Sequence, residues 1–199
     1  MLLDIIILPP ADLREKFGLE TRKAARNASR FFVVDNITRI PHLSLWHVKT
    51  SEKNIPELVS SLQKAVSGIK PIRTECKGLE ISEKRNGGIV NIGIKKNRAF
   101  AILQNAVMHA TYPFKTGMMP QTFGAWRGKK LEYARKYGRP GGVPPHITLG
   151  WLKSKRGVQR FARTAKIKDT SFASRHIYVS EVDTYWQVRR IIKKVGLGK

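Results

Sequence analysis

Short apolar runs alternate along the chain with segments in which apolar residues recur every three or four positions. Residues 2–8 form a nearly continuous apolar run that ends at Pro9 and Pro10, which is typical of a buried strand. The dipeptide Asn86-Gly87 favours a hairpin turn. The same criteria predict further strands at 42–49, 73–82, 89–96 and 176–192, and helices at 12–29, 51–69, 98–110 and 154–165. Strands and helices mixed in this way predict an α/β or α+β domain.

The stretch at about 111–144 has a different composition. It is rich in proline, glycine, methionine and aromatic residues, and its basic residues greatly outnumber its single acid, Glu132. We predict a long loop here, with a short helix at 129–137. No linker of low complexity divides the chain, so residues 1–199 are predicted to form one domain with 111–144 as an insertion.

Two nine-residue stretches nearly repeat each other. PHLSLWHVK begins at Pro41 and PHITLGWLK begins at Pro145, and both have a histidine, a hydroxyl residue and a leucine at matched positions. A single histidine followed two residues later by serine or threonine is a weak signal. Two copies in matched contexts, both on predicted strands, are a specific one.

Strand geometry explains the spacing inside each motif. Side chains alternate between the two faces of a strand, so residues two apart share a face. His42 therefore projects with Ser44, and His146 projects with Thr148, while the apolar residues beside them point into a core. Each motif is predicted to present one imidazole and one hydroxyl on a single face.

This pair of groups suits the cleavage of phosphoesters without a metal ion. Histidine titrates near neutral pH, so one imidazole can accept a proton while another donates one. Serine and threonine hydroxyls can donate hydrogen bonds to phosphate oxygens. The single cysteine, Cys76, and the remaining histidines have no metal-ligand spacing, so we expect neither a metal ion nor a cofactor.

The charge of the chain narrows the class of partner. It has 38 lysines and arginines against 14 aspartates and glutamates, a formal net charge of +24. Such a charge attracts polyanions, and a nucleic acid, either RNA or DNA, is the expected partner. The basic residues form no long amphipathic helix, and no apolar run reaches the roughly 20 residues of a membrane helix, so no membrane association is predicted. A reducing, cytoplasmic location is expected.

With the motifs in view, the chain resembles the two-histidine phosphoesterase superfamily, which is defined by two H-x-(S/T) motifs. It is most similar to the branch of 2′-5′ RNA ligases and RNA 2′,3′-cyclic phosphodiesterases, and YGRPGGVPPHITL at 137–149 resembles the approach to the second motif in that branch. The resemblance implies an α+β fold of two pseudo-symmetric lobes, each an antiparallel sheet with helices outside. It also implies an active-site cleft between the lobes, with one motif on a central strand of each, and a monomer.

The resemblance also implies roles for the motif residues. His42 and His146 match the catalytic pair, and Ser44 and Thr148 match the phosphate-binding hydroxyls. One histidine would activate water to open a 2′,3′-cyclic phosphate, and the other would protonate the ribose oxygen that leaves. The reverse reaction with a 5′-hydroxyl RNA end would form a 2′-5′ linkage. The ligase branch often has an arginine shortly after the second motif, whereas here Lys153 is the first cation.

Aromatic and basic side chains near the motifs are candidate RNA contacts. By strand alternation Trp46 shares the face of His42 and could stack on a base or pack in the core, while His47 points to the opposite face. The helix predicted at 129–137 and its flanks either grip single-stranded RNA or form a solvated amphipathic helix. The candidate substrate-binding residues are Trp46, Arg127, Lys129, Lys130, Tyr133, Arg135, Tyr137 and Lys153.

Three functions remain open on the sequence alone. The first is a metal-independent RNA phosphoesterase that acts on 2′,3′-cyclic phosphate ends. The second keeps the site and changes the substrate to 2′-5′-linked or cyclic oligonucleotide signals. The third is a basic RNA-binding protein with an inactive site.

Overall fold

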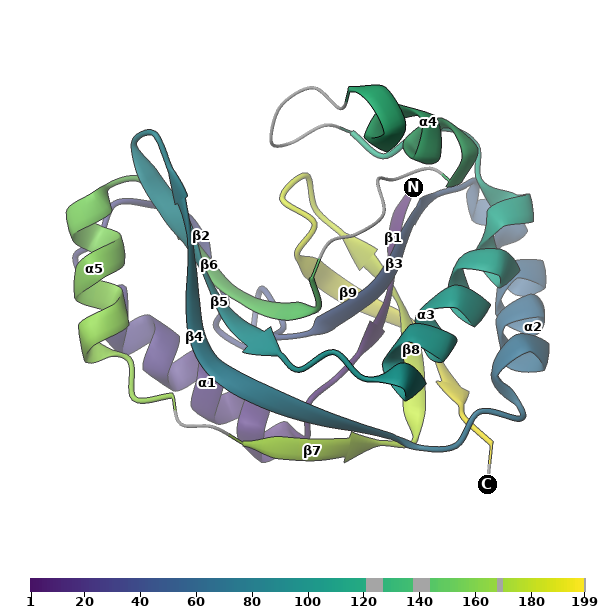
Figure 1. Cartoon of the computed structure of the whole chain (residues 1–199), viewed down its shortest axis with the longest axis horizontal. Helices are drawn as coiled ribbons and strands as arrows, with labels where there is room; N and C mark the ends of the chain where they lie inside the picture. The colour runs from purple at the N-terminus through teal and green to yellow at the C-terminus, as the bar shows by residue number, and fades with distance from the viewer. Residues whose placement is uncertain (121–126, 138–143, 168–169, 199) are drawn as a thin grey trace.

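The computed structural model describes residues 1–120, 127–137, 144–167 and 170–198. These residues form a single curled sheet with helices on its outside (Figure 1). The strands are β1 (Leu2–Ile7), β2 (Arg30–Val33), β3 (Leu43–Lys49), β4 (Ile72–Lys84), β5 (Gly87–Ile94), β6 (His146–Leu152), β7 (Ser171–Ser174), β8 (His176–Val182) and β9 (Val188–Gly196). The helices are α1 (Ala11–Ala24), α2 (Ile55–Val66), α3 (Arg98–Thr111), α4 (Gly128–Tyr137) and α5 (Lys155–Thr164).

The sheet consists of two halves that meet at the motif strands. Its order is β7-β4-β5-β6-β3-β1-β8-β9, and β2 pairs with the free edge of β6. All the pairings are antiparallel, but β3 and β6 share only the pair Leu43–Ile147 before they diverge. The mixed α+β class expected from the sequence pattern and the two sheet halves implied by the resemblance are therefore confirmed.

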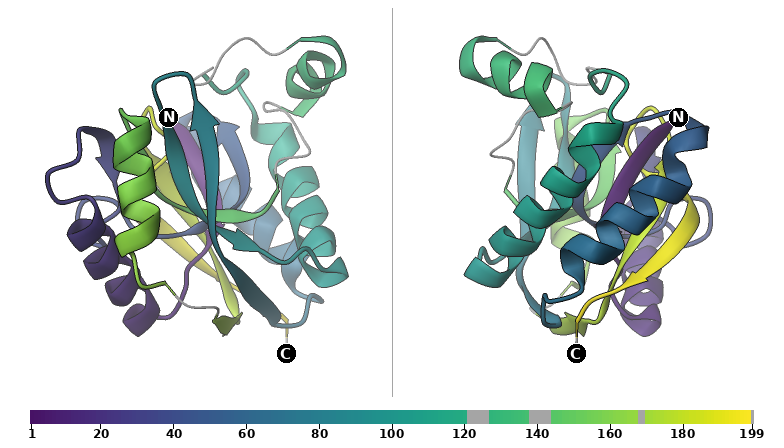
Figure 2. Two further views of the ribbon diagram at one scale, coloured as in Figure 1. Left: turned by 60° about the vertical axis from the view of Figure 1, so that its left-hand side comes forward. Right: turned by 90° about the vertical axis from the view of Figure 1, so that its right-hand side faces the viewer.

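Each half of the sheet has its own pair of helices on the outer face. Helices α1 and α5 pack on the half that contains β4, β5 and β6, whereas α2 and α3 cover the half that contains β3 and β9 (Figure 2). Strand β1 belongs to the half that contains β3 and β9, but helix α1, which follows it in the chain, packs on the other half. The chain therefore crosses between the two halves within its first 24 residues. Buried aliphatic residues from both halves form one continuous core between the sheet and these helices.

Local signals in the sequence account for several element ends. Asn97 accepts a hydrogen bond from the backbone N–H of Phe100 at 2.7 Å and begins α3, and Ser154 accepts one from Gly157 at 3.0 Å and begins α5. Gly87 begins β5 directly after the hairpin turn. A Cβ at this position would clash with the carbonyl oxygen of Leu152 on β6, so only glycine fits there.

The structure differs from the predicted elements in three places. Helix α1 ends at Ala24, five residues before the predicted end. The stretch predicted as one strand at 176–192 is a hairpin of β8 and β9, because Asp183 Oδ1 accepts the backbone N–H groups of Tyr185 and Gln187 and holds a turn between them. Strand β7 was not predicted. No helix in the described part of the chain is both long and apolar enough to cross a bilayer.

Candidate active site

The single residue pair between β3 and β6 places the two motifs side by side. In an antiparallel pair, residues opposite each other share a face, and their neighbours follow in opposite directions along the two strands. Because Leu43 lies opposite Ile147 in the core, the same register brings His42 beside Thr148 and Ser44 beside His146. Each histidine therefore lies next to the hydroxyl residue of the other motif.

The two histidines are held by the same contact. His42 Nδ1 lies 2.7 Å from the carbonyl oxygen of Ile40, and His146 Nδ1 lies 2.7 Å from the carbonyl oxygen of Pro144. A carbonyl oxygen can only accept, so Nδ1 carries the proton in both rings. Nε2 is then the atom of each neutral imidazole that can accept a proton.

Both motif strands carry a β-bulge at the motif leucine. Ile6 and Ile5 of β1 pair with Ser44 and Trp46, so Leu45 has no partner opposite it. In β6 the same irregularity leaves Leu149 without a partner opposite it on β5. An extra residue reverses the alternation of side chains beyond it. The positions three residues after Ser44 and Thr148 therefore turn to the face that carries the histidines.

These bulges overturn two predictions about side-chain direction. Trp46 does not share the face of His42, because its side chain is only 3% exposed and packs in the main core. His47 does share that face, because its Nε2 lies 3.0 Å from Asp4 Oδ2, the atom to which Ser44 donates. Strict alternation fails here because the extra residue lies between Ser44 and Trp46.

Asp4 is a buried carboxylate at the centre of the first motif. It is fully buried on β1, and Ser44 Oγ donates to its Oδ2 at 2.6 Å. The Nε2 atoms of His42 and His47 lie 3.5 Å and 3.0 Å from the same oxygen. Its other oxygen, Oδ1, is buried and has no hydrogen-bond partner among the described residues. Asp4 was not predicted as a site residue, although one acid inside an apolar strand was the available signal.

The second motif has different neighbours at the matching positions. In the register of β5 and β6, Ile89 lies opposite Trp151, as Asp4 lies opposite His47 in the first motif. Asn91 lies opposite Thr148, is 7% exposed, and its Oδ1 has no hydrogen-bond partner among the described residues. The Thr148 side chain makes no hydrogen bond within the described part of the chain.

Comparisons with known proteins find the fold but no sequence relative. No family model and no curated protein match the chain. TT0787 of Thermus thermophilus matches with a TM-score of 0.65 at 15% identity, with 100% of both chains covered. A structure described as a phosphoesterase matches with a TM-score of 0.61 at 17% sequence identity, and the match covers 100% of this chain and 99% of that one. LigT of E. coli matches with a TM-score of 0.59 at 17% sequence identity, and the match covers 100% of this chain and 98% of LigT. LigT has also been solved with 3′-AMP.

The chain has the two-histidine phosphoesterase fold. The resemblance carried by the two motifs is thus confirmed at the level of the fold. In the two-histidine fold of this chain, the position three residues after Thr148 is Trp151, and it lies on the same strand face as the motif residues. This is the stretch in which the ligase branch often has an arginine.

The turn between β8 and β9 contacts both halves of this two-histidine site, and it rises between them in Figure 1. Trp186 lies against His47 with ring centroids 4.8 Å apart, and Tyr185 lies against Trp151 with centroids 6.0 Å apart. Trp186 has φ +61, a left-handed conformation that is strained for a bulky residue. Asp183 holds the turn in place, and Arg39 Nε donates to Asp183 Oδ2 at 3.1 Å.

The candidate RNA contacts around α4 fall into two groups. The exposed cations are Arg127, Lys129, Lys130 and Arg135. Tyr133 instead packs against the core, its hydroxyl lies 3.0 Å from the sulfur of Met108, and its ring lies edge-on to Trp46. The side chain of Tyr137 and residues 138–143 lie outside the described residues. Helix α4 is therefore anchored by Tyr133 and presents cations to solvent.

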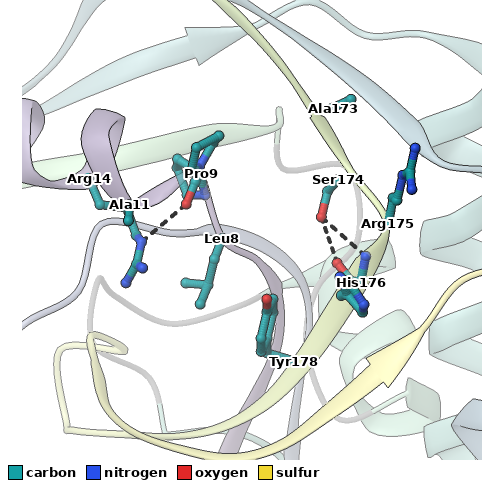
Figure 3. A pocket seen from close by; sticks show the side chains of 10 residues that line it. Leu8, Pro9, Ala11, Arg14, Ala173, Ser174, Arg175, His176 and Tyr178 are labelled. Atoms are coloured by element: carbon teal, nitrogen blue, oxygen red, sulfur yellow. Dashed lines mark hydrogen bonds between the residues drawn. The ribbon is translucent and has the colours of Figure 1, made fainter.

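A pocket of about 330 Å³ lies apart from the motif residues, where β1 leads into α1 and β7 leads into β8 (Figure 3). Arg14, Arg175 and His176 contribute its basic groups. Burial lowers the pKa of His176, and the charges of Lys194 and Arg175 lower it further. Among the described residues, no group of three or more His, Cys, Asp or Glu side chains is placed to hold a metal ion.

Proposed function

We propose that this chain is a metal-independent phosphoesterase that opens the 2′,3′-cyclic phosphate ends of RNA. The observation that carries the proposal is the register of the motif strands, which brings each histidine beside the hydroxyl residue of the other motif. The matched backbone contacts of the two Nδ1 atoms support it, because they leave both Nε2 atoms for proton transfer. The fold shared with LigT and a phosphoesterase supports the same class of reaction.

The proposed reaction needs one proton acceptor and one proton donor. One imidazole removes a proton from water through Nε2 as the water oxygen forms a bond to phosphorus. The bond between phosphorus and one ribose oxygen breaks, and the second imidazole donates its Nε2 proton to that oxygen. The products are a free ribose hydroxyl and a phosphate monoester. Proton exchange with solvent restores both histidines.

We assign the proton donor to His42. Asp4 is fully buried and its Oδ2 lies 3.5 Å from His42 Nε2, so the nitrogen that would transfer a proton to the leaving oxygen lies beside a carboxylate. Near the second motif, Ile89 holds the position that matches Asp4. The acid Glu80 packs over Gly93, opposite His146, but is exposed, so water and salt screen its charge. His146 is then the proton acceptor.

The two hydroxyl residues have unequal roles in this proposal. Thr148 donates to a non-bridging phosphate oxygen, because no described residue occupies its hydroxyl. Ser44 already donates to Asp4, so it acts mainly by holding Asp4 beside His42. This changes the expectation from the sequence, which gave both hydroxyls the same role.

Charge and the ligand of a structural neighbour support an RNA end as the substrate. A net charge of +24 favours a polyanion over a small neutral substrate. LigT has been solved with 3′-AMP, a nucleotide with a phosphate on the ribose carbon where a cyclic phosphate would open. The same site run in reverse would join this end to a 5′-hydroxyl through a 2′-5′ linkage.

The direct test is incubation of the purified protein with a short RNA that ends in a 2′,3′-cyclic phosphate, in the presence of EDTA. The variants His42→Ala/His146→Ala and His109→Ala are purified and assayed in parallel, and mass spectrometry resolves the product ends. His109 is exposed on α3 and provides a matched histidine outside the motifs. We expect ring opening by the wild type and His109→Ala, and none by the double variant.

Other outcomes separate the alternatives. A large loss of rate with EDTA would contradict the metal-independent mechanism. Salt-sensitive RNA binding without turnover, unchanged in the double variant, would favour an RNA-binding protein with an inactive site. Turnover of 2′-5′-linked oligonucleotides in place of cyclic ends would favour the signalling substrate.

A further inference from the structure

An aromatic cluster adjoins the second motif on the face that carries His146 and Thr148. The bulge at Leu149 turns Trp151 to this face, and Phe31 on β2 packs against Trp151 with ring centroids 4.3 Å apart. Tyr185, from the β8–β9 turn, lies 6.0 Å from Trp151 and 6.3 Å from Phe31. Three rings from three separate parts of the chain therefore meet beside one motif.

These rings remain accessible to solvent. Phe31 is 42% exposed, and Trp151 and Tyr185 are half-buried. A large aromatic side chain that is exposed beside a polar site leaves apolar surface in water, which a planar apolar ligand would cover. The turn that presents Tyr185 is held by Asp183, so the cluster is a fixed surface.

A cation completes the cluster. Lys153 Nζ lies 4.8 Å from the centre of the Phe31 ring, in a cation–π contact. Its long side chain allows it to leave the ring and pair with a phosphate when one is present. Stacking rings next to a mobile cation are the features with which proteins bind single-stranded nucleotides.

We propose that Phe31, Trp151 and Tyr185 form a nucleobase subsite, in which the base of the nucleotide that carries the cyclic phosphate stacks while Lys153 contacts an adjacent phosphate. Trp151 lies three strand residues from Thr148, a span of about 10 Å that matches the scale of one nucleotide. This inference rests on the proposed function. It moves base stacking from Trp46, which is buried in the core, to Trp151 at the corresponding surface of the second motif.

The test compares a substrate that has a base with one that lacks it. Adenosine 2′,3′-cyclic phosphate and methyl riboside 2′,3′-cyclic phosphate contain the same reacting group, and only the first can stack. We expect the wild type to prefer the nucleotide by about tenfold or more in kcat/KM. Phe31→Leu should reduce this preference to about twofold or less, because it removes a ring on which only the adenosine base can stack.

A matched variant controls for the loss of an exposed ring. Tyr112 is 41% exposed and has Lys115 Nζ 5.9 Å from its ring centre, and it directly follows α3, one of the helices on the outside of the sheet. Tyr112→Leu should leave the preference unchanged. Trp151→Phe keeps an aromatic ring and should retain most of the preference, whereas Trp151→Leu should lose it.

Binding is measured as well, so that the proposed nucleobase subsite is tested independently of the proposed reaction. Calorimetry compares the wild-type affinity for adenosine 3′-phosphate with that for methyl riboside 3-phosphate, and we expect the adenosine compound to bind about tenfold more tightly. Turnover of both cyclic substrates at equal rates, or equal affinity for both phosphates, would overturn the subsite. A binding preference lost in Phe31→Leu, without turnover of either substrate, would refute the proposed reaction and support the subsite.

Discussion

The two motif halves share a backbone and differ in chemistry. Each has a histidine held at Nδ1 by a carbonyl two residues earlier, and each has a bulge at the motif leucine. In the first half, Asp4, Ser44 and His47 surround His42 with a buried polar network. In the second half, Trp151 and its aromatic neighbours lie three residues along β6 from Thr148, whose hydroxyl makes no hydrogen bond to a described residue. The repeated sequence accounts for the similarity, and the strands beside it account for the difference.

The neighbouring strands place unlike residues at equivalent positions. Asp4 on β1 corresponds to Ile89 on β5, and Ile6 corresponds to Asn91. A carboxylate beside one imidazole and an aliphatic residue at the matching place suit two different halves of an acid–base reaction. A pseudo-symmetric fold can therefore support an asymmetric reaction without any change in the motifs.

The largest expected effect tests what the halves have in common. We predict that His42→Ala and His146→Ala each lower kcat/KM on a cyclic-phosphate RNA by about 10²–10⁴-fold, because each removes one proton transfer. Steady-state kinetics would measure this, with His109→Ala as the control. A loss confined to one of the two variants would contradict the shared site.

The next effect tests the buried network that only the first half has. Asp4→Ala removes the acceptor of Ser44 and the carboxylate that forms an ion pair with His47 when its imidazole is protonated, and breaking such a buried pair costs about 3–5 kcal/mol in the free energy of unfolding. For a chain of this size the melting temperature should fall by roughly 6–20 °C. Ile89→Val at the matching position is half-buried and should change the unfolding free energy by about 0.5 kcal/mol or less. Equal melting temperatures for the two variants would show that Asp4 stabilises nothing.

Substitution of the two motif hydroxyl residues should have different effects: loss of the Ser44 hydroxyl should lower stability, and loss of the Thr148 hydroxyl should lower activity. Ser44→Ala leaves a buried carboxylate with one donor fewer, so it should cost about 1–2 kcal/mol in the free energy of unfolding. Thr148→Val should leave unfolding nearly unchanged and lower kcat/KM by about tenfold, because it removes a donor to the phosphate. Chemical denaturation and kinetics on both variants check this. The reverse pattern would contradict the unequal roles.

The smallest effect concerns the loop at 35–39, which joins β2 of one half to β3 of the other. Burial raises the pKa of Asp35, but the backbone N–H groups of Ile37 and Arg39 and the hydroxyl of Thr38 lower it more, and the net pKa lies below 3.8. Ionised Asp35 therefore stabilises the fold above pH 3.8, and this contribution is lost as the pH falls from 3.8 through the lowered pKa. Thermal melts of the wild type and Asp35→Asn should converge over that range. If the difference in melting temperature between the wild type and Asp35→Asn stays constant with pH, the charge of Asp35 does not contribute to stability.

Much of the fold followed from apolar patterning. The strand at residues 2–8, the hairpin at Asn86-Gly87 and the helix at 98–110 were predicted close to their observed bounds, because each has a period and a terminal signal of its own. The H-x-(S/T) spacing also predicted which two side chains of each motif share a face. These features depend on residues near one another in the chain.

The features that were missed depend on contacts between distant residues. The bulges at Leu45 and Leu149 exist only in relation to the strands that pair with them, so strict alternation misplaced Trp46 and His47. Asp4 and Ser44 are 40 residues apart, and Phe31 and Trp151 meet only because β2 pairs with β6. The turn that places Tyr185 and Trp186 against opposite halves likewise requires the complete sheet.

The most direct test of the unequal halves uses a substrate whose leaving group needs no proton. In a 2′-deoxynucleoside 3′-(4-nitrophenyl) phosphate, nitrophenolate takes the place of the departing ribose oxygen. Rates of His42→Ala and His146→Ala relative to wild type are then measured on this ester and on the cyclic phosphate. If His42 is the proton donor, His42→Ala should recover to within about tenfold of wild type on the ester, while His146→Ala stays at least about 10²-fold slower. Equal defects of both variants on both substrates would contradict the assignment.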